Sequence, residues 1–219
     1  IYTVSISEVF FFFLAYSTTP FFLKCKLTPT MPSFLCLVSG VLSAYIIHFG
    51  TSTSYQAGII LFSLSVLFDN VDGCVARATN NTSFYGRFID GWIDIITRYL
   101  LYLALTYVIY QRFGTIPLFW MSLVSFLIAP FNFFIFDRYS AYIRWMNESK
   151  KLTEKPYIRK SFLINVASVI EDIRRLSLIL AIFDFFIGMC IYFTLNLILH
   201  IYYISLHIST AYKTMKVSF

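Results

Sequence analysis

Charged residues are scarce in this chain. Only 13% of its 219 residues are Asp, Glu, Lys or Arg, whereas 58% are hydrophobic and 20% are aromatic. A typical soluble domain carries about 25% charged residues, so this composition excludes an ordinary soluble fold. Long apolar stretches separated by short polar ones predict an all-α, polytopic membrane protein.

Several signatures of common sites are also missing. The four cysteines form no CxxC pair, and the three histidines share no metal-ligand spacing. These absences argue against a disulfide framework and a zinc site. No GxxxxGK[ST] loop is present either, so any nucleotide phosphates must be held in another way.

The apolar stretches predict six transmembrane helices preceded by one interfacial helix. Residues 6–16 are too few for a bilayer that needs about 20 helical residues, so we expect residues 1–26 to form an interfacial or juxtamembrane segment. Residues 27–219 then form the membrane domain, with a polar, basic connector at 137–175. The predicted spans are 31–49, 55–68 with a helical extension to 77, 84–110, 117–136, 176–193 and 195–212.

Smaller features refine this outline. Gly40 and Ala44 give the first span a small-residue face suited to close helix packing. Poor helix formers at 79–82 predict a break between the second and third spans. The chain starts at Ile1 without a methionine, which leads us to expect a preceding segment in the full protein.

Basic residues are unevenly distributed between the predicted loops. With both termini inside, Arg112 is the only Lys or Arg on the outside. The inside loops hold nine Lys or Arg from Arg138 to Arg175 alone. The positive-inside rule therefore predicts an integral membrane protein with both termini and the junction at 69–94 on the cytoplasmic side.

Four aspartates gather at that junction. Asp69 and Asp72 are three residues apart, and Asp90 and Asp94 are four apart, so on helices each pair lies on one face. A charged residue inside a membrane span costs about 2.5 to 3.5 kcal/mol, so the four carboxylates need a compensating partner. Carboxylate oxygens are suitable ligands for Mg²⁺, Mn²⁺ or Ca²⁺.

The carboxylates also stand at fixed spacing from small residues and an arginine. The stretch from Asp69 to Asp94 reads D-x2-D-G-x2-A-R-x8-G-x3-D-x3-D. This pattern resembles the complete signature of the CDP-alcohol phosphotransferases, also called CDP-alcohol phosphatidyltransferases. The resemblance implies a membrane enzyme of phospholipid biosynthesis that moves a substituted phosphate, most often phosphatidyl, from a CDP-alcohol to the hydroxyl of an alcohol acceptor and releases CMP.

The residues and the resemblance together predict the site. Asp94 is implied as the general base. A metal, Mg²⁺ or Mn²⁺ and up to two ions, would be held by Asp69, Asp72, Asp90 and Asp94. Arg77 can pair with a donor phosphate, and small residues allow the nucleotide close to the backbone. The predicted CDP-alcohol site is Gly73, Ala76, Arg77 and Gly86.

The acceptor side is less defined. Arg138 and Arg174 could bind a phosphorylated acceptor, or the connector could simply bind anionic lipid headgroups. Asp184 is a functional candidate because it falls within a predicted span, and Arg98 could hold Asp94 ionised or bind the acceptor. Glycerol phosphate, serine and inositol phosphate all stay open as acceptors.

The expected partners are a CDP-alcohol donor, with CDP-diacylglycerol first, an alcohol acceptor, the bilayer and a second copy of the chain in a homodimer. No nucleic acid is expected. Three alternative functions compete with this one. A transferase could use a small soluble CDP-linked donor for a non-glycerolipid product. A cation transporter would place its acidic residues at mid-membrane on several helices. A non-catalytic membrane anchor would not need glycines in step with the carboxylates.

Overall fold

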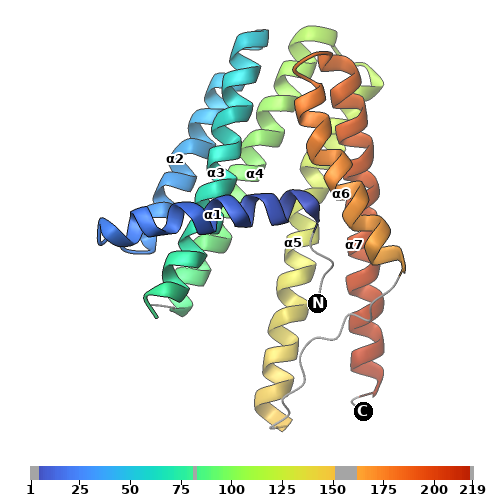
Figure 1. Ribbon diagram of the computed structural model, residues 1–219. Coiled ribbons are helices and arrows are strands. Elements are labelled where there is room, and N and C mark those ends of the chain that lie inside the picture. Colours follow the sequence, from blue (N-terminus) through green and yellow to red (C-terminus); the bar gives the residue numbers. More distant parts are fainter. Residues whose placement is uncertain (1–4, 81–82, 151–161, 218–219) are drawn as a thin grey trace.

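The computed structural model describes residues 5–80, 83–150 and 162–217, and this part is α-helical without strands (Figure 1). The first helix lies across the others, while the remaining helices run along one bundle axis. In chain order the helices are α1 (Ile6–Lys24), α2 (Thr30–Ile47), α3 (Ser52–Ala78), α4 (Phe84–Phe113), α5 (Pro117–Lys150), α6 (Phe162–Leu180) and α7 (Phe185–Val217).

Six of the described helices are long and apolar enough to cross a membrane: α1, α2, α3, α4, α5 and α7. Helix α6 differs because Glu171, Asp172, Arg174 and Arg175 concentrate charge in its second half. The directions of the helices group them differently. Helix α6 runs along the bundle like the other helices, whereas α1 crosses it (Figure 1). The chain is an all-α, polytopic integral membrane protein.

The predicted boundaries hold best in the first half of the chain. Helices α2, α3 and α4 match the predicted spans. A break between the second and third spans is confirmed, because α3 ends at Ala78 and α4 begins at Phe84. The fourth span continues beyond the predicted end at 136, because α5 extends to Lys150. The predicted connector at 137–175 is therefore wrong in extent. Its residues 137–150 belong to α5 and its residues 162–175 to α6, while 151–161 lie outside the described residues.

The last two predicted spans are wrong in position. The predicted break near 194 falls inside α7, and the chain turns instead at 181–184. Gly188 permits this tight turn, because a Cβ added there would lie 2.5 Å from the backbone of Ala181. Asp184 is not inside a span as predicted. It is exposed and caps α7, with its Oδ1 accepting a hydrogen bond of 3.0 Å from the backbone N–H of Ile187.

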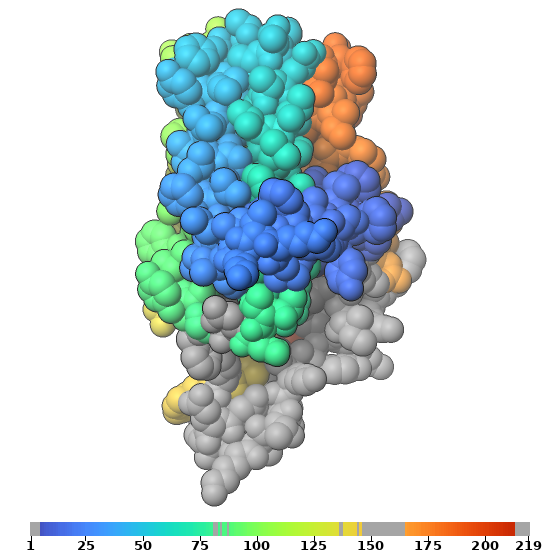
Figure 2. All heavy atoms as spheres, turned by 60° about the vertical axis from the view of Figure 1, so that its left-hand side comes forward, coloured from blue at the N-terminus to red at the C-terminus, as the bar shows by residue number. Residues whose placement is uncertain are grey.

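Helix α1 is longer than predicted. The polar residues after position 16 do not interrupt it, because the hydroxyls of Ser17 and Thr18 donate to backbone carbonyls in the preceding turn. Its buried residues Ala15 and Phe22 pack against Val71 and Val75 of α3. Figure 2 shows α1 as a dark-blue band across the outside of the molecule. This crosswise direction is the one that an interfacial helix requires.

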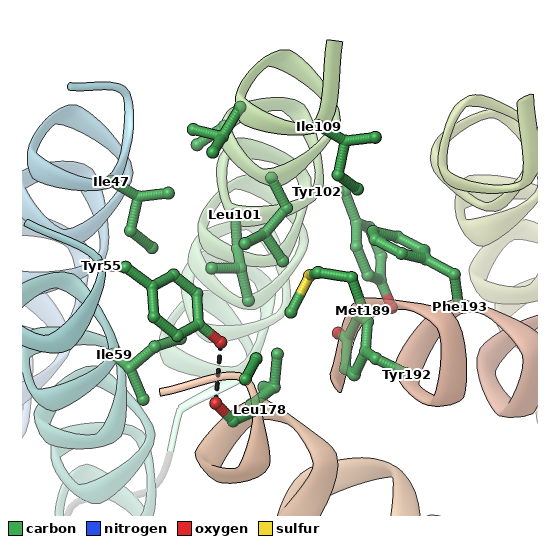
Figure 3. Packing of buried hydrophobic residues seen from close by; sticks show 14 of the residues in the cluster. Ile47, Tyr55, Ile59, Leu101, Tyr102, Ile109, Leu178, Met189, Tyr192 and Phe193 are labelled. Carbon is green, nitrogen blue, oxygen red and sulfur yellow. Dashed lines mark hydrogen bonds between the residues drawn. The ribbon is translucent and has the colours of Figure 1, made fainter. Parts of the chain in front are cut away.

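A large apolar core joins the helices from α2 to α7 (Figure 3). Tyr55 of α3 is buried there, and its hydroxyl donates to the backbone carbonyl of Leu178 at 2.7 Å. The predicted close packing at Gly40 is confirmed, because a Cβ added there would lie 2.5 Å from Cγ2 of Thr97 in α4. The small residue thus allows α2 to approach α4.

Two side chains of α6 hold the start of α1. Asp172 accepts hydrogen bonds from the backbone N–H groups of Ile6 and Ser7, at 2.9 and 2.8 Å. Arg175 donates to the hydroxyl of Ser7 at 2.8 Å and forms an ion pair with Glu8 at 3.2 Å. A carboxylate at a helix N-terminus satisfies free N–H groups and favours the helix dipole. Asp172 therefore serves as a cap supplied by another helix.

Replacing Asp172 with alanine should loosen α1. The loss of a helix cap costs about 1 kcal/mol, so we expect Asp172→Ala to lower the unfolding temperature in detergent and to speed trypsin cleavage after the exposed Lys24 and Lys26. Asp184→Ala is the matched control, because it removes the cap of α7 and leaves α1 attached. Equal cleavage rates in both variants would contradict this role for Asp172.

Candidate active site

The junction of α3 and α4 carries the predicted site. Helix α3 ends at Ala78, where Asn80 adopts a left-handed conformation with φ of 52°. Ser83 then begins α4 as its N-cap, its side chain accepting a hydrogen bond of 2.9 Å from the backbone N–H of Gly86. Polar side chains that satisfy free backbone groups stop one helix and start the next. The two helices therefore present their aspartates to each other across a short turn.

The structure brings the four aspartates together. The carboxyl groups of Asp72 and Asp90 lie within hydrogen-bonding reach of each other, and Asp90 is also within reach of Asp69. The charge of Asp94 acts on both Asp69 and Asp90. Asp72 is the most buried of the four, at 7% exposed, and the others are partly exposed. The site is thus a group of like charges at the edge of the protein interior.

Only one of the four aspartates has a basic partner among the described residues. Arg98 forms an ion pair of 2.8 Å with Asp94, one turn away on α4, and its guanidinium lies 5.4 Å from the ring centroid of Phe133. No ion pair in the described part of the chain involves Asp69, Asp72 or Asp90. The arginine whose role the sequence left open is therefore the partner of Asp94.

Sequence reasoning missed Ser33. This residue of α2 donates a hydrogen bond of 2.6 Å from its hydroxyl to Oδ2 of Asp72, and it lies one turn beyond Pro29. A neutral donor stabilises an ionised carboxylate and restricts its orientation. The only signal in the sequence was its place one turn after the Thr-Pro pair that opens the first span. The contact makes α2 a third wall of the site.

The carboxylates suit a divalent metal ion in chemistry and in charge. Asp69, Asp72 and Asp90 offer several oxygen ligands and have no ion-pair partner in the part of the chain that the structure describes. Such oxygens are the donors that hard cations prefer. Within the described residues, no three His, Cys, Asp or Glu side chains are already arranged to hold a metal. Binding of one ion by three of these aspartates therefore requires their side chains to adopt other rotamers.

The predicted donor-side residues lie next to the carboxylates in sequence and on the same two helices. Arg77 is exposed, and a Cβ added at Gly73 would lie 3.3 Å from one of its guanidinium nitrogens. The glycine thus leaves space for the arginine along α3. Ala76 is partly exposed on the same helix, and Gly86 lies in the first turn of α4.

The two arginines predicted for the acceptor differ in environment. Arg138 is exposed, and its guanidinium lies 5.2 Å from the ring centroid of Phe134 on its own helix. Arg174 lies within the bundle with 15% of its side chain exposed, and it forms an ion pair with Glu171. It also donates to the hydroxyl of Tyr192 at 3.2 Å and to Oδ1 of Asn196 at 3.3 Å. Arg174 is thus part of an internal polar cluster, and Arg138 lies at the surface.

Known proteins share both sequence and fold with this chain. Residues 29–202 match the CDP-alcohol phosphatidyltransferase family. An archaetidylinositol phosphate synthase of Aeropyrum pernix is 34% identical over 121 residues. The match covers 50% of this chain and 60% of that relative, so the chain spans less than two thirds of the length of the relative.

Two crystal structures of Mycobacterium tuberculosis phosphatidylinositol phosphate synthase have a similar fold, at 19% identity to this chain. The structure with manganese and citrate has a TM-score of 0.58 and covers 88% of both chains. The structure with CDP-DAG bound has a TM-score of 0.57, covering 88% of this chain and 92% of the other. Together with the family match over most of the chain, these findings show that the protein belongs to the CDP-alcohol phosphatidyltransferase family.

Proposed function

We propose that the protein transfers a substituted phosphate group from a CDP-alcohol to the hydroxyl of an alcohol acceptor and releases CMP. The observation that carries this proposal is the meeting of Asp69, Asp72, Asp90 and Asp94 at one helical junction in a member of this family. A CDP-alcohol carries a diphosphate, and without a phosphate-binding loop its charge must be met by a cation. The aspartates supply the ligands for that cation.

The four aspartates would hold Mg²⁺ or Mn²⁺, as one ion or two. A bound ion of this kind neutralises the diphosphate and polarises the phosphorus that is attacked. The manganese in a structure of similar fold supports this choice of metal. On the protein side, Arg77 pairs with a diphosphate oxygen, while Gly73, Ala76 and Gly86 leave the backbone accessible to the nucleotide.

In the proposed reaction Asp94 is the general base. It takes the proton from the acceptor hydroxyl, and the hydroxyl oxygen forms a bond to the β-phosphorus, which carries the alcohol of the donor. The bond from this phosphorus to the bridging oxygen breaks, and CMP leaves with that oxygen. Arg98, at 2.8 Å, orients the Asp94 carboxylate. The ion pair thus prepares the carboxylate for the proton.

For the substrates we propose a lipid donor, CDP-diacylglycerol or a related CDP-linked lipid, and a small hydroxylated acceptor. The CDP-DAG-bound structure of similar fold supports the donor, and the activities for which the two similar synthases are named favour an inositol phosphate acceptor. On this proposal Arg174 and Arg138 face the acceptor phosphate, with Arg174 nearer the buried end. A homodimer is proposed from the resemblance to the family alone.

We further propose that the site and both termini face the cytoplasm. The described turns at the end of the bundle opposite the aspartates, residues 48–51, 114–116 and 181–184, contain no Lys or Arg. The site end carries most of the basic residues, which supports a cytoplasmic orientation by the positive-inside rule.

Cysteine labelling tests this orientation. In a background with the four native cysteines replaced, a cysteine at Thr115 should react with a membrane-impermeant maleimide added to intact cells, because residue 115 lies in an outside turn. A cysteine at Lys26 should react only after the membrane is opened. The reverse pattern would contradict the proposed orientation.

Replacing Asp94 with asparagine tests the chemistry. Removing a general base lowers a rate by about 10² to 10⁴, so Asp94→Asn should reduce CMP release from CDP-diacylglycerol in liposomes by that factor. A chelator should stop wild-type release, and Mn²⁺ or Mg²⁺ should restore it. Asp184→Asn, at the far end of the bundle, is the control and should stay active. Metal-dependent ion flux without CMP release would favour a transporter instead.

Replacing Ser33 with alanine tests the third wall of the site. A hydrogen bond to a charged group contributes about 1.5 to 3 kcal/mol, so Ser33→Ala should raise the Mn²⁺ concentration for half-maximal activity roughly tenfold. Ser39→Ala is the control, because its hydroxyl donates only to carbonyls of α2. An unchanged Mn²⁺ dependence in Ser33→Ala would show that Asp72 does not need this donor.

A further inference from the structure

Polar side chains continue along α4 and α7 beyond Asp94. On α4, Asp94, Arg98 and Tyr102 follow at intervals of four residues. Each therefore lies about one helical turn, or 5.4 Å, beyond the last and on nearly the same face of the helix. On α7, Asn196 and His200 have the same spacing. The hydroxyl of Tyr102 donates to Oδ1 of Asn196 at 2.9 Å and joins the two helices.

Three atoms of this region have no hydrogen-bond partner in the described structure, although they are buried. They are Oδ1 of Asn132 on α5, Nδ2 of Asn196 and Nε2 of His200. Asn196 is only 2% exposed, and Nδ2 of Asn132 lies 3.4 Å from Nδ1 of His200. A buried polar atom without a partner costs about 1 to 3 kcal/mol, and most buried polar groups are satisfied. Three such atoms from two helices indicate a polar occupant.

The charges around these atoms are already balanced. Arg98 is paired with Asp94, and Arg174 is paired with Glu171. Arg174 donates to Oδ1 of Asn196 at 3.3 Å, one turn from His200 on α7, so the pair of Arg174 and Glu171 borders this region. The unpartnered atoms comprise one acceptor, one donor and one imidazole nitrogen that can serve as either. A neutral group that both donates and accepts, such as a hydroxyl, matches this set better than an anion.

We propose that Asn132, Asn196 and His200 bind hydroxyl groups of the acceptor alcohol other than the one that reacts. Asn132 is next to Phe133, whose ring contacts Arg98 one turn from Asp94, and it lies beside His200. Asn196 contacts Tyr102, two turns from Asp94, so a polyol with one hydroxyl at Asp94 meets Asn132 and His200 first and Asn196 only at its far end. The three residues then select polyhydroxylated acceptors over simple alcohols. This inference rests on the proposed function and extends it from reaction to acceptor specificity.

The test combines deletions in the acceptor with deletions in the protein. Wild-type protein in liposomes is first assayed for CMP release with glycerol phosphate, inositol phosphate and serine as acceptors. The most active acceptor is then compared with analogues that each lack one hydroxyl. The variants are Asn132→Leu and Asn196→Asp, the second of which keeps an oxygen for Tyr102. Ser125→Ala is the control, because its buried hydroxyl also has no partner in the described structure but lies two turns away on α5.

For wild type we expect the loss of one contacted hydroxyl to raise the acceptor KM about tenfold, the value of one hydrogen bond. Asn132→Leu and Asn196→Asp should each raise the KM for the complete acceptor by a similar factor. In each variant this KM should not rise further when the acceptor lacks one particular hydroxyl. Such non-additivity marks a direct contact. The KM for the donor should not change, and Ser125→Ala should behave as wild type.

Two results would overturn the inference. If wild type used every analogue as well as the complete acceptor, no second hydroxyl would be bound, whatever the variants did. The second result concerns the free-energy cost calculated from each rise in acceptor KM. If the cost of the variant and the cost of the analogue added for every hydroxyl, the three residues would hold buried water rather than the acceptor. The proposed function fails in a different way, through the absence of CMP release by wild type with any acceptor, and the inference would fall with it.

Discussion

Repulsion between carboxylates that are held close together is the constraint around which this protein is arranged. Asp69, Asp72, Asp90 and Asp94 share one junction, and only Asp94 has a basic partner among the described residues. Like charges repel more strongly near a protein interior than in water, so the free site is electrostatically unfavourable. Carboxylates grouped in this way are suitable ligands for a divalent cation, which would offset their repulsion.

The helical bundle has to keep the four aspartates close together although their charges repel one another. Helices α3 and α4 each pack mainly on α2, and the apolar core around Tyr55 joins all three helices (Figure 3). Close contact of Gly40 with Thr97 brings α2 against α4, and this in turn places Ser33 at Asp72. Apolar packing between the helices thus keeps the aspartates in place, which their mutual repulsion alone would not do.

Helix α6 connects the surface of the protein with its interior. Asp172 and Arg175 face outward to the start of α1, while Arg174 faces the internal polar cluster with Tyr192 and Asn196. Glu171 pairs with both arginines and joins the two sides. A short charged segment therefore performs two tasks, and this dual use explains why α6 is too polar to be recognised as a span.

The sequence by itself determined the class of the protein, the break at 79–82, the close approach at Gly40 and the spacing that identifies the family. These features are local, because composition, helix capping and helical periodicity act within a few turns of chain. The tertiary structure alone decided that the last turn lies at 181–184, since apolar residues continue on both sides of it and hydropathy does not mark where a buried chain reverses. It also decided that α1 lies across the bundle and that Ser33, Asn132 and Asn196 meet groups far away in sequence, because such contacts depend on how helices cross.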